Sequence, residues 1–386
     1  MPADNPFKHP RPPRAAVRWN KLVLVFKDDV LHGFDGQSNH TGPRWPIRLP
    51  VVDERDLIGC NCDETTLRLG PHMITMTQRR DFLQKTAGGF AIAATCPLTA
   101  LASNPSFDLV IRGGTLVDGT GTPGVRHDLG IKGARIAAIG NLSEATARRV
   151  INATNRIVCP GFIDMHTHSD STLLQDGLAK SAVRQGATTH VVGNCGSSPT
   201  DIATFFRDLR NGGTGPNIAI LVGHGSVRQK VMGRRPVPPT ADQLQQMKDL
   251  VRQAMRDGAV GLSTSLRYGP GSYAGTEEIV ALATEIKPFG GFYATHMRDE
   301  GTRIVEALEE ALVIGRRAEI PVHVSHHKIS SASVFGLTRQ TLARIDAARR
   351  NGVDVSLDQY PYGAGSGGVA LYVPQRSLAG LSLIHI

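Results

Sequence analysis

Two histidines one residue apart, His166 and His168, end the apolar stretch GFIDMHTHSD. Three later apolar stretches also end in residues that commonly bind metals: Cys195 in GNCG, His296 in ATHMRDE and His326 in VSHHK. Imidazole and thiolate ligands together are typical of Zn²⁺, which accepts mixed nitrogen and sulfur donors. A lone histidine at a strand end is usually structural and a lone cysteine is usually a small buried residue, but this combination predicts a metal site.

The predicted ligands belong to a repeating pattern that extends over residues 161–380. Seven short apolar stretches are typical of strands: GFIDMHTH, ATTHVVGNCG, NIAILVGHG, GAVGLSTSLRY, GFYATHMRDE, PVHVSHHK and VDVSLDQYPY. Segments between them, such as ADQLQQMKDLVRQAMRDG and RIVEALEEALVIGRRA, have apolar residues three and four apart, as in amphipathic helices. Repeated strand and helix units predict a parallel sheet, and seven of them predict most of an α/β (β/α)8 TIM barrel.

Such a barrel would bring the candidate ligands together. The active site of a (β/α)8 barrel lies at the carboxyl ends of its strands. Residues two apart on a strand point the same way, so His166 and His168 can both reach that end from the first strand.

The chain before the predicted barrel has three parts. Residues 103–160 contain FDLVIRGGTLVDGTG, HDLGIKGARIAAIG and ARRVINATNRIVCPGF, which predict part of a small β-sandwich. Residues 76–102 contain Arg79 and Arg80 before a weakly apolar segment and resemble a twin-arginine export signal, which predicts a periplasmic protein. The alternative is a short Ala-rich helix packed in a core. Residues 1–75 show no sustained period, and we interpret them as a non-native or disordered extension.

Composition argues against several classes of function. The 386 residues include 43 basic and 34 acidic side chains scattered along the chain, and only 5% are aromatic, so nucleic-acid binding is not expected. No apolar run approaches the roughly 18 residues of a membrane span. The 5 cysteines lack the paired spacing of a structural zinc site.

The order of motifs resembles the amidohydrolase superfamily, and within it the D-aminoacylase or N-acyl-D-amino-acid deacylase group. The resemblance rests on FDLVIRGG, GFIDMHTHSD, VVGNCG, ATHMRDE and ISSASVFG, and GNCG is its most specific element. It implies zinc-dependent hydrolysis of the linear amide bond of N-acyl-D-amino acids. In this group a cysteine takes the place of the carboxylated lysine that bridges two metals in many relatives. The resemblance thus implies that Cys195, His296 and His326 hold a tighter zinc, and that His166 and His168 face a second, weaker position.

The resemblance also implies roles around the metals. Tyr268 in SLRYGPG resembles the family's tyrosine near the scissile carbonyl, with packing of a loop as the alternative. Side-chain alternation puts Lys328 on the same side as His326, where it would present a cation to a substrate carboxylate; a solvated loop lysine is the alternative. The same alternation turns His327 the opposite way. His224 in GHGSVR is expected to support the site or the fold.

The residue that would transfer a proton from the attacking water to the leaving amine is unknown from this sequence. The family uses an aspartate on the eighth strand, which we expect beyond residue 380. Asp358, on the seventh strand, matches a different family position and is a weak candidate. Residues 381–386, LSLIHI, can be encoded by a sequencing-adaptor sequence, and we interpret them as an artefact. The barrel is therefore expected to be incomplete at its carboxyl end and this fragment to be inactive.

Two other classes of function remain open. A cyclic amidase of the hydantoinase or dihydroorotase type, or an isoaspartyl-type dipeptidase, would share the barrel and most ligands. A barrel that only binds a small ligand is the second alternative, but an intact set of metal-binding side chains argues against it. The sequence does not predict the preferred D-amino acid or acyl group, nor the oligomeric state.

Overall fold

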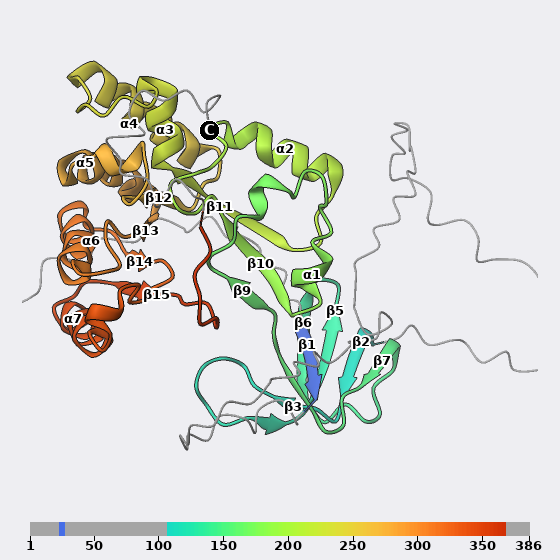
Figure 1. Cartoon of the computed structure of the whole chain (residues 1–386). Helices are drawn as coiled ribbons and strands as arrows, with labels where there is room; N and C mark the ends of the chain where they lie inside the picture. The colour runs from blue at the N-terminus through green and yellow to red at the C-terminus, as the bar shows by residue number, and fades with distance from the viewer. Residues whose placement is uncertain (1–22, 28–105, 368–386) are drawn as a thin grey trace, which may run out of the picture. The chain divides into compact units, whose positions relative to one another are not determined.

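A computed structural model describes residues 23–27 and 106–367 of the chain (Figure 1). The described residues form two compact units, one of residues 23–27, 115–125 and 155–367 and the other of residues 106–114 and 126–154. The predicted export signal and residues 381–386 lie outside the described residues.

The second unit is built on a sheet with the order β6-β5-β2-β7. Its strands are β2 (Phe107–Arg112), β5 (Asp128–Lys132), β6 (Arg135–Gly140) and β7 (Ala147–Asn152). The central strand β2 is buried along Leu109–Ile111 and pairs antiparallel to β5 and parallel to β7. The Asp128 carboxylate accepts the backbone N–H groups of Gly113 at 2.8 Å and Leu142 at 2.9 Å, which fixes the turns at the strand ends.

A separate small sheet belongs to the first unit and has the order β1-β8-β3-β4. Strand β1 (Val23–Lys27) runs antiparallel to β8 (Arg156–Pro160), and β8 runs parallel to β3 (Thr115–Leu116). The short β4 (Val125–Arg126) completes it. The β-rich stretches before residue 161 thus form the strands that their sequences predict, and one strand comes from residues for which the sequence predicted none.

The first unit also contains the predicted parallel sheet. Its strands are β9 (Phe162–Asp164), β10 (Ala187–Val192), β11 (Asn217–Gly223), β12 (Gly261–Ser265), β13 (Phe292–His296), β14 (Val322–Val324) and β15 (Val355–Leu357). They pair in chain order and all in parallel, with β9 and β15 at the two edges of a curled sheet (Figure 1). The prediction of an incomplete (β/α)8 barrel of the α/β class is confirmed.

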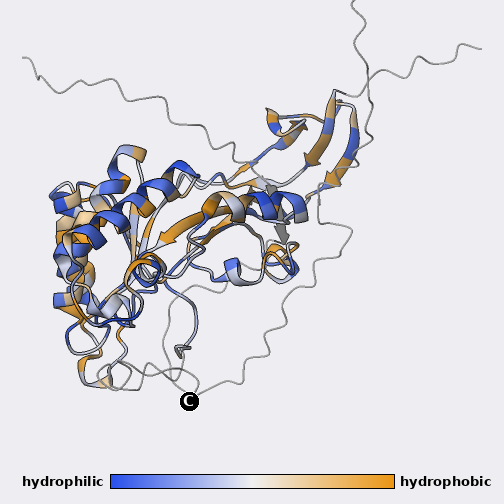
Figure 2. Cartoon of the chain, turned by 90° about the horizontal axis from the view of Figure 1, so that it is seen from above, coloured by the Kyte–Doolittle hydropathy of each residue, from blue (hydrophilic) through white to orange (hydrophobic). Residues whose placement is uncertain are grey.

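Helices cover the outer side of this sheet. They are α1 (Lys180–Val183), α2 (Ile202–Gly212), α3 (His224–Met232), α4 (Ala241–Arg256), α5 (Thr276–Ile286), α6 (Ile304–Ala318) and α7 (Thr338–Arg350). Helix α4 starts at a capping box in which Thr240 and Gln243 bond each other's backbone N–H, and it buries Met247, Val251 and Ala254. Figure 2 shows hydrophobic residues concentrated on the strands, and hydrophobic and hydrophilic residues alternating along the helices. Among the described residues, no helix combines the length and apolar character needed to cross a membrane.

Candidate metal centre

The GNCG turn after β10 needs each of its small residues. Cys195 has a left-handed backbone with φ of 52°, and it lies between Gly193 and Gly196, whose φ values are 75° and 73°. A Cβ at Gly193 would lie 2.1 Å from the carbonyl oxygen of Leu221, so only glycine fits against the neighbouring strand β11. The turn therefore presents the Cys195 thiol in a fixed direction at the carboxyl end of the sheet.

Asn194 connects this turn to the segment that carries His166 and His168. Its side chain is fully buried, and Nδ2 donates to the carbonyl oxygen of Val191 at 2.8 Å. The same nitrogen contacts the carbonyl oxygens of Thr167 at 3.4 Å and Met165 at 3.5 Å. One side chain thus holds the ends of β9 and β10 in register at the candidate centre.

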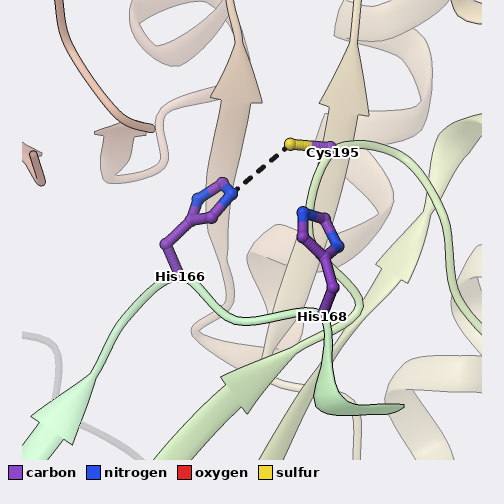
Figure 3. A group of neighbouring side chains, drawn as sticks. All are labelled: His166, His168 and Cys195. Carbon is purple, nitrogen blue, oxygen red and sulfur yellow. Dashed lines mark hydrogen bonds between the residues drawn. The ribbon is translucent and has the colours of Figure 1, made fainter. Parts of the chain in front are cut away.

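The five predicted ligands meet at the Cys195 sulfur. Sγ lies 3.5 Å from Nε2 of His166, 3.8 Å from Nδ1 of His296 and 3.7 Å from Nε2 of His326. The ligand atoms of His166, His168 and Cys195 lie within 4.8 Å of one another, and so do those of Cys195, His296 and His326. Figure 3 shows the first of these trios, with both histidines on the segment after β9. The two trios share Cys195, which is the geometry of a bridging ligand.

These distances fit a zinc ion. With Zn–S of about 2.3 Å and Zn–N of about 2.05 Å, tetrahedral coordination separates sulfur from nitrogen by about 3.6 Å. Burial lowers the pKa of His296 to about 3 and that of His166 to about 4, so both imidazoles keep a free lone pair. Burial, with nearby Glu300, raises the pKa of the Cys195 thiol to about 12. A bound cation is what would stabilise its thiolate in this surrounding.

Asp358, which follows β15, orients the histidines. Oδ1 accepts the backbone N–H of His326 at 2.6 Å. Oδ2 lies 2.7 Å from Nε2 of His323 and 3.7 Å from Nδ1 of His166. Such outer contacts fix the orientation of a histidine ligand. With both oxygens engaged, Asp358 is placed to position ligands, and its contacts give no support for a role as the base.

Glu300 is part of the site although the sequence did not indicate it. Oε1 lies 2.8 Å from Nδ1 of His326, and Oε2 lies 2.6 Å from Nζ of Lys328. Burial would raise the pKa of this carboxyl, but the histidines and Lys328 outweigh it and lower the pKa to about 2. The ATHMRDE stretch contains Glu300, but its partners His326 and Lys328, which follow β14, lie too far along the chain for any local pattern to reveal them.

A family model described as the Amidohydrolase family matches residues 149–371. The chain belongs to this family. Two curated relatives come from Alcaligenes xylosoxydans xylosoxydans: a D-aminoacylase, 44% identical over 67% of this chain, and an N-acyl-D-glutamate deacylase, 39% identical over 70%. The chain spans 58% and 59% of the lengths of these relatives.

A solved structure also resembles this chain in fold and sequence. The N-acyl-D-glutamate deacylase of Bordetella bronchiseptica, solved with zinc and a phosphonate mimic of the tetrahedral intermediate, is 39% identical to this amidohydrolase with a TM-score of 0.64. The match covers 66% of this chain and 59% of that structure. Relatives of this amidohydrolase therefore carry a metal centre, and the described residues include candidate ligands for one.

The predicted substrate-side residues of the amidohydrolase lie beside the trios. The Tyr268 ring meets that of His296 edge-on, with the centroids 4.7 Å apart. Nζ of Lys328 lies 3.2 Å from Nδ1 of His326 as well as against Glu300. His327 is buried, its backbone N–H donates to the carbonyl oxygen of Asp358 at 2.9 Å, and it belongs to neither trio.

His224 belongs to a buried charged group. Nε2 of His224 lies 2.8 Å from Oε1 of Glu278, which is also bonded by Nη1 of Arg228 at 2.7 Å. All three side chains are buried. His224 is in neither trio, and its contact with Glu278 gives it a structural role in the fold.

A polar cavity of about 310 Å³ opens next to the candidate centre. His296 and Glu300 form its inner wall, and Arg267, Thr302 and Ser330 lie around it. This volume is at the lower end of the range for small-molecule sites. The cavity thus borders the candidate centre at His296, a member of the second trio.

Proposed function

We propose that this amidohydrolase cleaves the amide bond of N-acyl-D-amino acids with zinc as its metal. The observation that carries the proposal is the pair of trios that meet at Cys195 with sulfur-to-nitrogen distances of 3.5 to 3.8 Å. Similarity to D-aminoacylase and to N-acyl-D-glutamate deacylase supports the substrate class. Cys195, His296 and His326 would hold the tighter zinc, and His166 and His168 a second, weaker one.

Each side chain has a part in this proposal. When bound, zinc would supply polarisation of the amide carbonyl and a nucleophilic water at neutral pH. Tyr268, packed on His296, would donate its hydroxyl to the developing oxyanion. Lys328, held by Glu300, would bind the substrate carboxylate. Tyr268→Phe should therefore lower kcat, and Lys328→Met should raise KM by roughly tenfold or more, because a charge-assisted hydrogen bond contributes ~1.5–3 kcal/mol.

The activity is tested on the protein encoded by the complete reading frame, from its natural start to its natural stop codon, here called the full-length protein. Release of free amino acid is measured from N-acetyl-D-methionine, N-acetyl-D-glutamate and their L-enantiomers. We expect release from the D-forms only. Equal release from L-substrates, or faster ring opening of a hydantoin or dihydroorotate, would show that the substrate class is wrong and that a cyclic amidase is the better description.

The metal assignment has its own test. The full-length protein should be purified and its zinc measured by mass spectrometry. We expect at least one zinc per chain, and Cys195→Ala should remove most of it because both trios lose their shared sulfur. Cys159→Ala is the matched control, since Cys159 is a free cysteine on β8 and in neither trio. Zinc retained in Cys195→Ala would show that the thiol is not a ligand.

We also propose that residues 76–102 direct the protein to the periplasm through the twin-arginine route. The support is the order of Arg79, Arg80 and the weakly apolar segment that follows them. A reporter fused to these residues should appear in the periplasm, and replacing both arginines with lysine should stop its export. A reporter that stays in the cytoplasm with the native arginines would contradict the proposal.

A further inference from the structure

The segment that carries Tyr268 is a compact turn between β12 and α5. The Ser272 backbone N–H donates to the carbonyl oxygen of Tyr268 at 2.7 Å, and a short 3₁₀ helix follows at Gly271–Tyr273. At the start of the segment, the Leu266 N–H donates to the carbonyl oxygen of His296 at 3.1 Å. The position of the Tyr268 ring against His296 therefore depends on what holds the far side of this turn.

Arg298 holds it. Nη1 donates to the carbonyl oxygen of Ser272 at 3.2 Å, and Nη2 donates to that of Ala274 at 2.9 Å. Ser272 is the residue whose N–H bonds Tyr268, so the path from Arg298 to Tyr268 runs through one residue. Arg298 itself lies two residues after His296, at the carboxyl end of β13. The Arg298 guanidinium thus joins the loop after His296 to the loop that contains Tyr268.

Glu310 on α6 fixes the direction of the Arg298 fork. Nε and Nη2 of Arg298 donate to the two carboxylate oxygens of Glu310, each at 2.8 Å. Oε1 of Glu310 also accepts the hydroxyl of Thr276, the first residue of α5, at 2.9 Å. The side chains of Arg298 and Glu310 are only 24% and 14% exposed, so water competes little for these bonds. A planar guanidinium can make all four bonds at once, whereas a lysine ammonium cannot.

We propose that Arg298, oriented by Glu310, is a positioning residue that sets Tyr268 against His296 for catalysis. The inference rests on the function proposed above, because Tyr268 matters only if its hydroxyl acts on the substrate. Arg298 lines neither trio and acts through the backbone of residues 272 and 274.

The first test measures backbone hydrogen exchange in residues 266–275 of the zinc-loaded full-length protein. Arg298→Met should speed exchange in this segment by roughly tenfold, because two hydrogen bonds that hold its carbonyls are lost. Arg298→Lys should behave similarly, since it keeps the charge but not the fork. Arg317→Met is the matched control: Arg317 makes a two-bond pair with Glu277, between the same helices α6 and α5, and both of its bonds lie outside residues 266–275. Unchanged exchange in Arg298→Met overturns the proposal, whether or not the protein hydrolyses these substrates.

The second test asks whether Arg298 acts through Tyr268. Arg298→Met should lower kcat by on the order of 10- to 100-fold, the effect of a displacement of about 1 Å at a reacting group, with zinc content unchanged. In a Tyr268→Phe background the same substitution should lower kcat much less, because the hydroxyl it positions is already gone. An equal loss in both backgrounds would mean a general structural role and would overturn the proposal. Glu310→Gln, which keeps the shape, should give a smaller loss of the same kind.

Discussion

Replacing Asn194 with alanine should separate the stability of the fold from the affinity of the metal site. The substitution removes one well-formed hydrogen bond to Val191, at 2.8 Å, and two long contacts to Thr167 and Met165, at 3.4 and 3.5 Å. The short bond contributes ~1 kcal/mol, and loss of the two longer contacts in this buried side chain raises the total to about 1–3 kcal/mol of unfolding free energy. Urea unfolding in the presence of a chelator measures this term without a contribution from metal binding.

The loss of zinc affinity in Asn194→Ala should be larger than the loss of unfolding free energy alone implies. Asn194 holds the turn of Cys195 to the segment of His166 and His168, and loss of such an outer contact typically weakens metal affinity ~10- to 100-fold. Affinity is measured by competition with a chromophoric zinc chelator. Asn217→Ala is the control, because Asn217 donates to Thr188 and Thr189 at the opposite end of β11 and should cost stability without changing affinity. Equal affinity in the wild type and Asn194→Ala would refute the reasoning.

Four further predictions concern the scaffold. Arg228→Met leaves the 5% exposed Glu278 carboxylate without its cation and should cost ~3–5 kcal/mol in urea unfolding, whereas a cost under about 1 kcal/mol would contradict this view of the buried pair. Burial would raise the pKa of Glu278, but its bonds to His224 and Arg228 outweigh burial and lower it. Its contribution to stability is therefore fully present above the ordinary glutamate pKa of ~4.3 and is lost as the pH falls further, and Glu278→Gln should remove this part of the acid dependence. Thr240→Ala should cost ~1 kcal/mol through loss of the α4 cap, with zinc content unchanged as the check. Ile163 is 54% exposed on the edge strand β9, so Ile163→Thr should reduce light scattering of residues 103–380 expressed alone; unchanged scattering would point to another surface.

The parallel sheet could be predicted because its strands carry their own local signal. All seven predicted stretches contain a strand of the sheet within residues 161–362, and α4 and α6 lie where apolar residues recur three and four apart. The five candidate ligands could be found because metal sites restrict the choice of side chain and barrels place such residues at strand ends.

Strand alternation does not explain the directions of the candidate site side chains after β9 and β14. Strand β9 ends at Asp164 and β14 at Val324, so His166 and His168 after the first and His326 and Lys328 after the second lie beyond the strands, where alternation does not apply. His326 has a left-handed backbone with φ of 38°, and this, with the Asp358 carboxylate on its N–H, directs its side chain.

The supporting contacts could not be predicted from the sequence. Asn194 bonds a carbonyl 27 residues earlier, and Asp358 bonds His323 from 35 residues later. Glu300 reaches the residues after β14 in the same way. Such contacts depend on the three-dimensional curl of the sheet, and neither periodicity nor motif spacing records it.

The two trios differ in how far apart their members lie along the chain. His166 and Cys195 follow the adjacent strands β9 and β10 and are separated by 29 residues, whereas Cys195 and His326 are separated by 131. At ~5–20 residues per second of synthesis, those 131 residues take roughly 7–26 s to appear. During that interval a nascent chain can offer the first trio but not the second. If both trios bind metal as proposed, an ion bound early at the first trio would share the Cys195 sulfur with an ion bound later at the second.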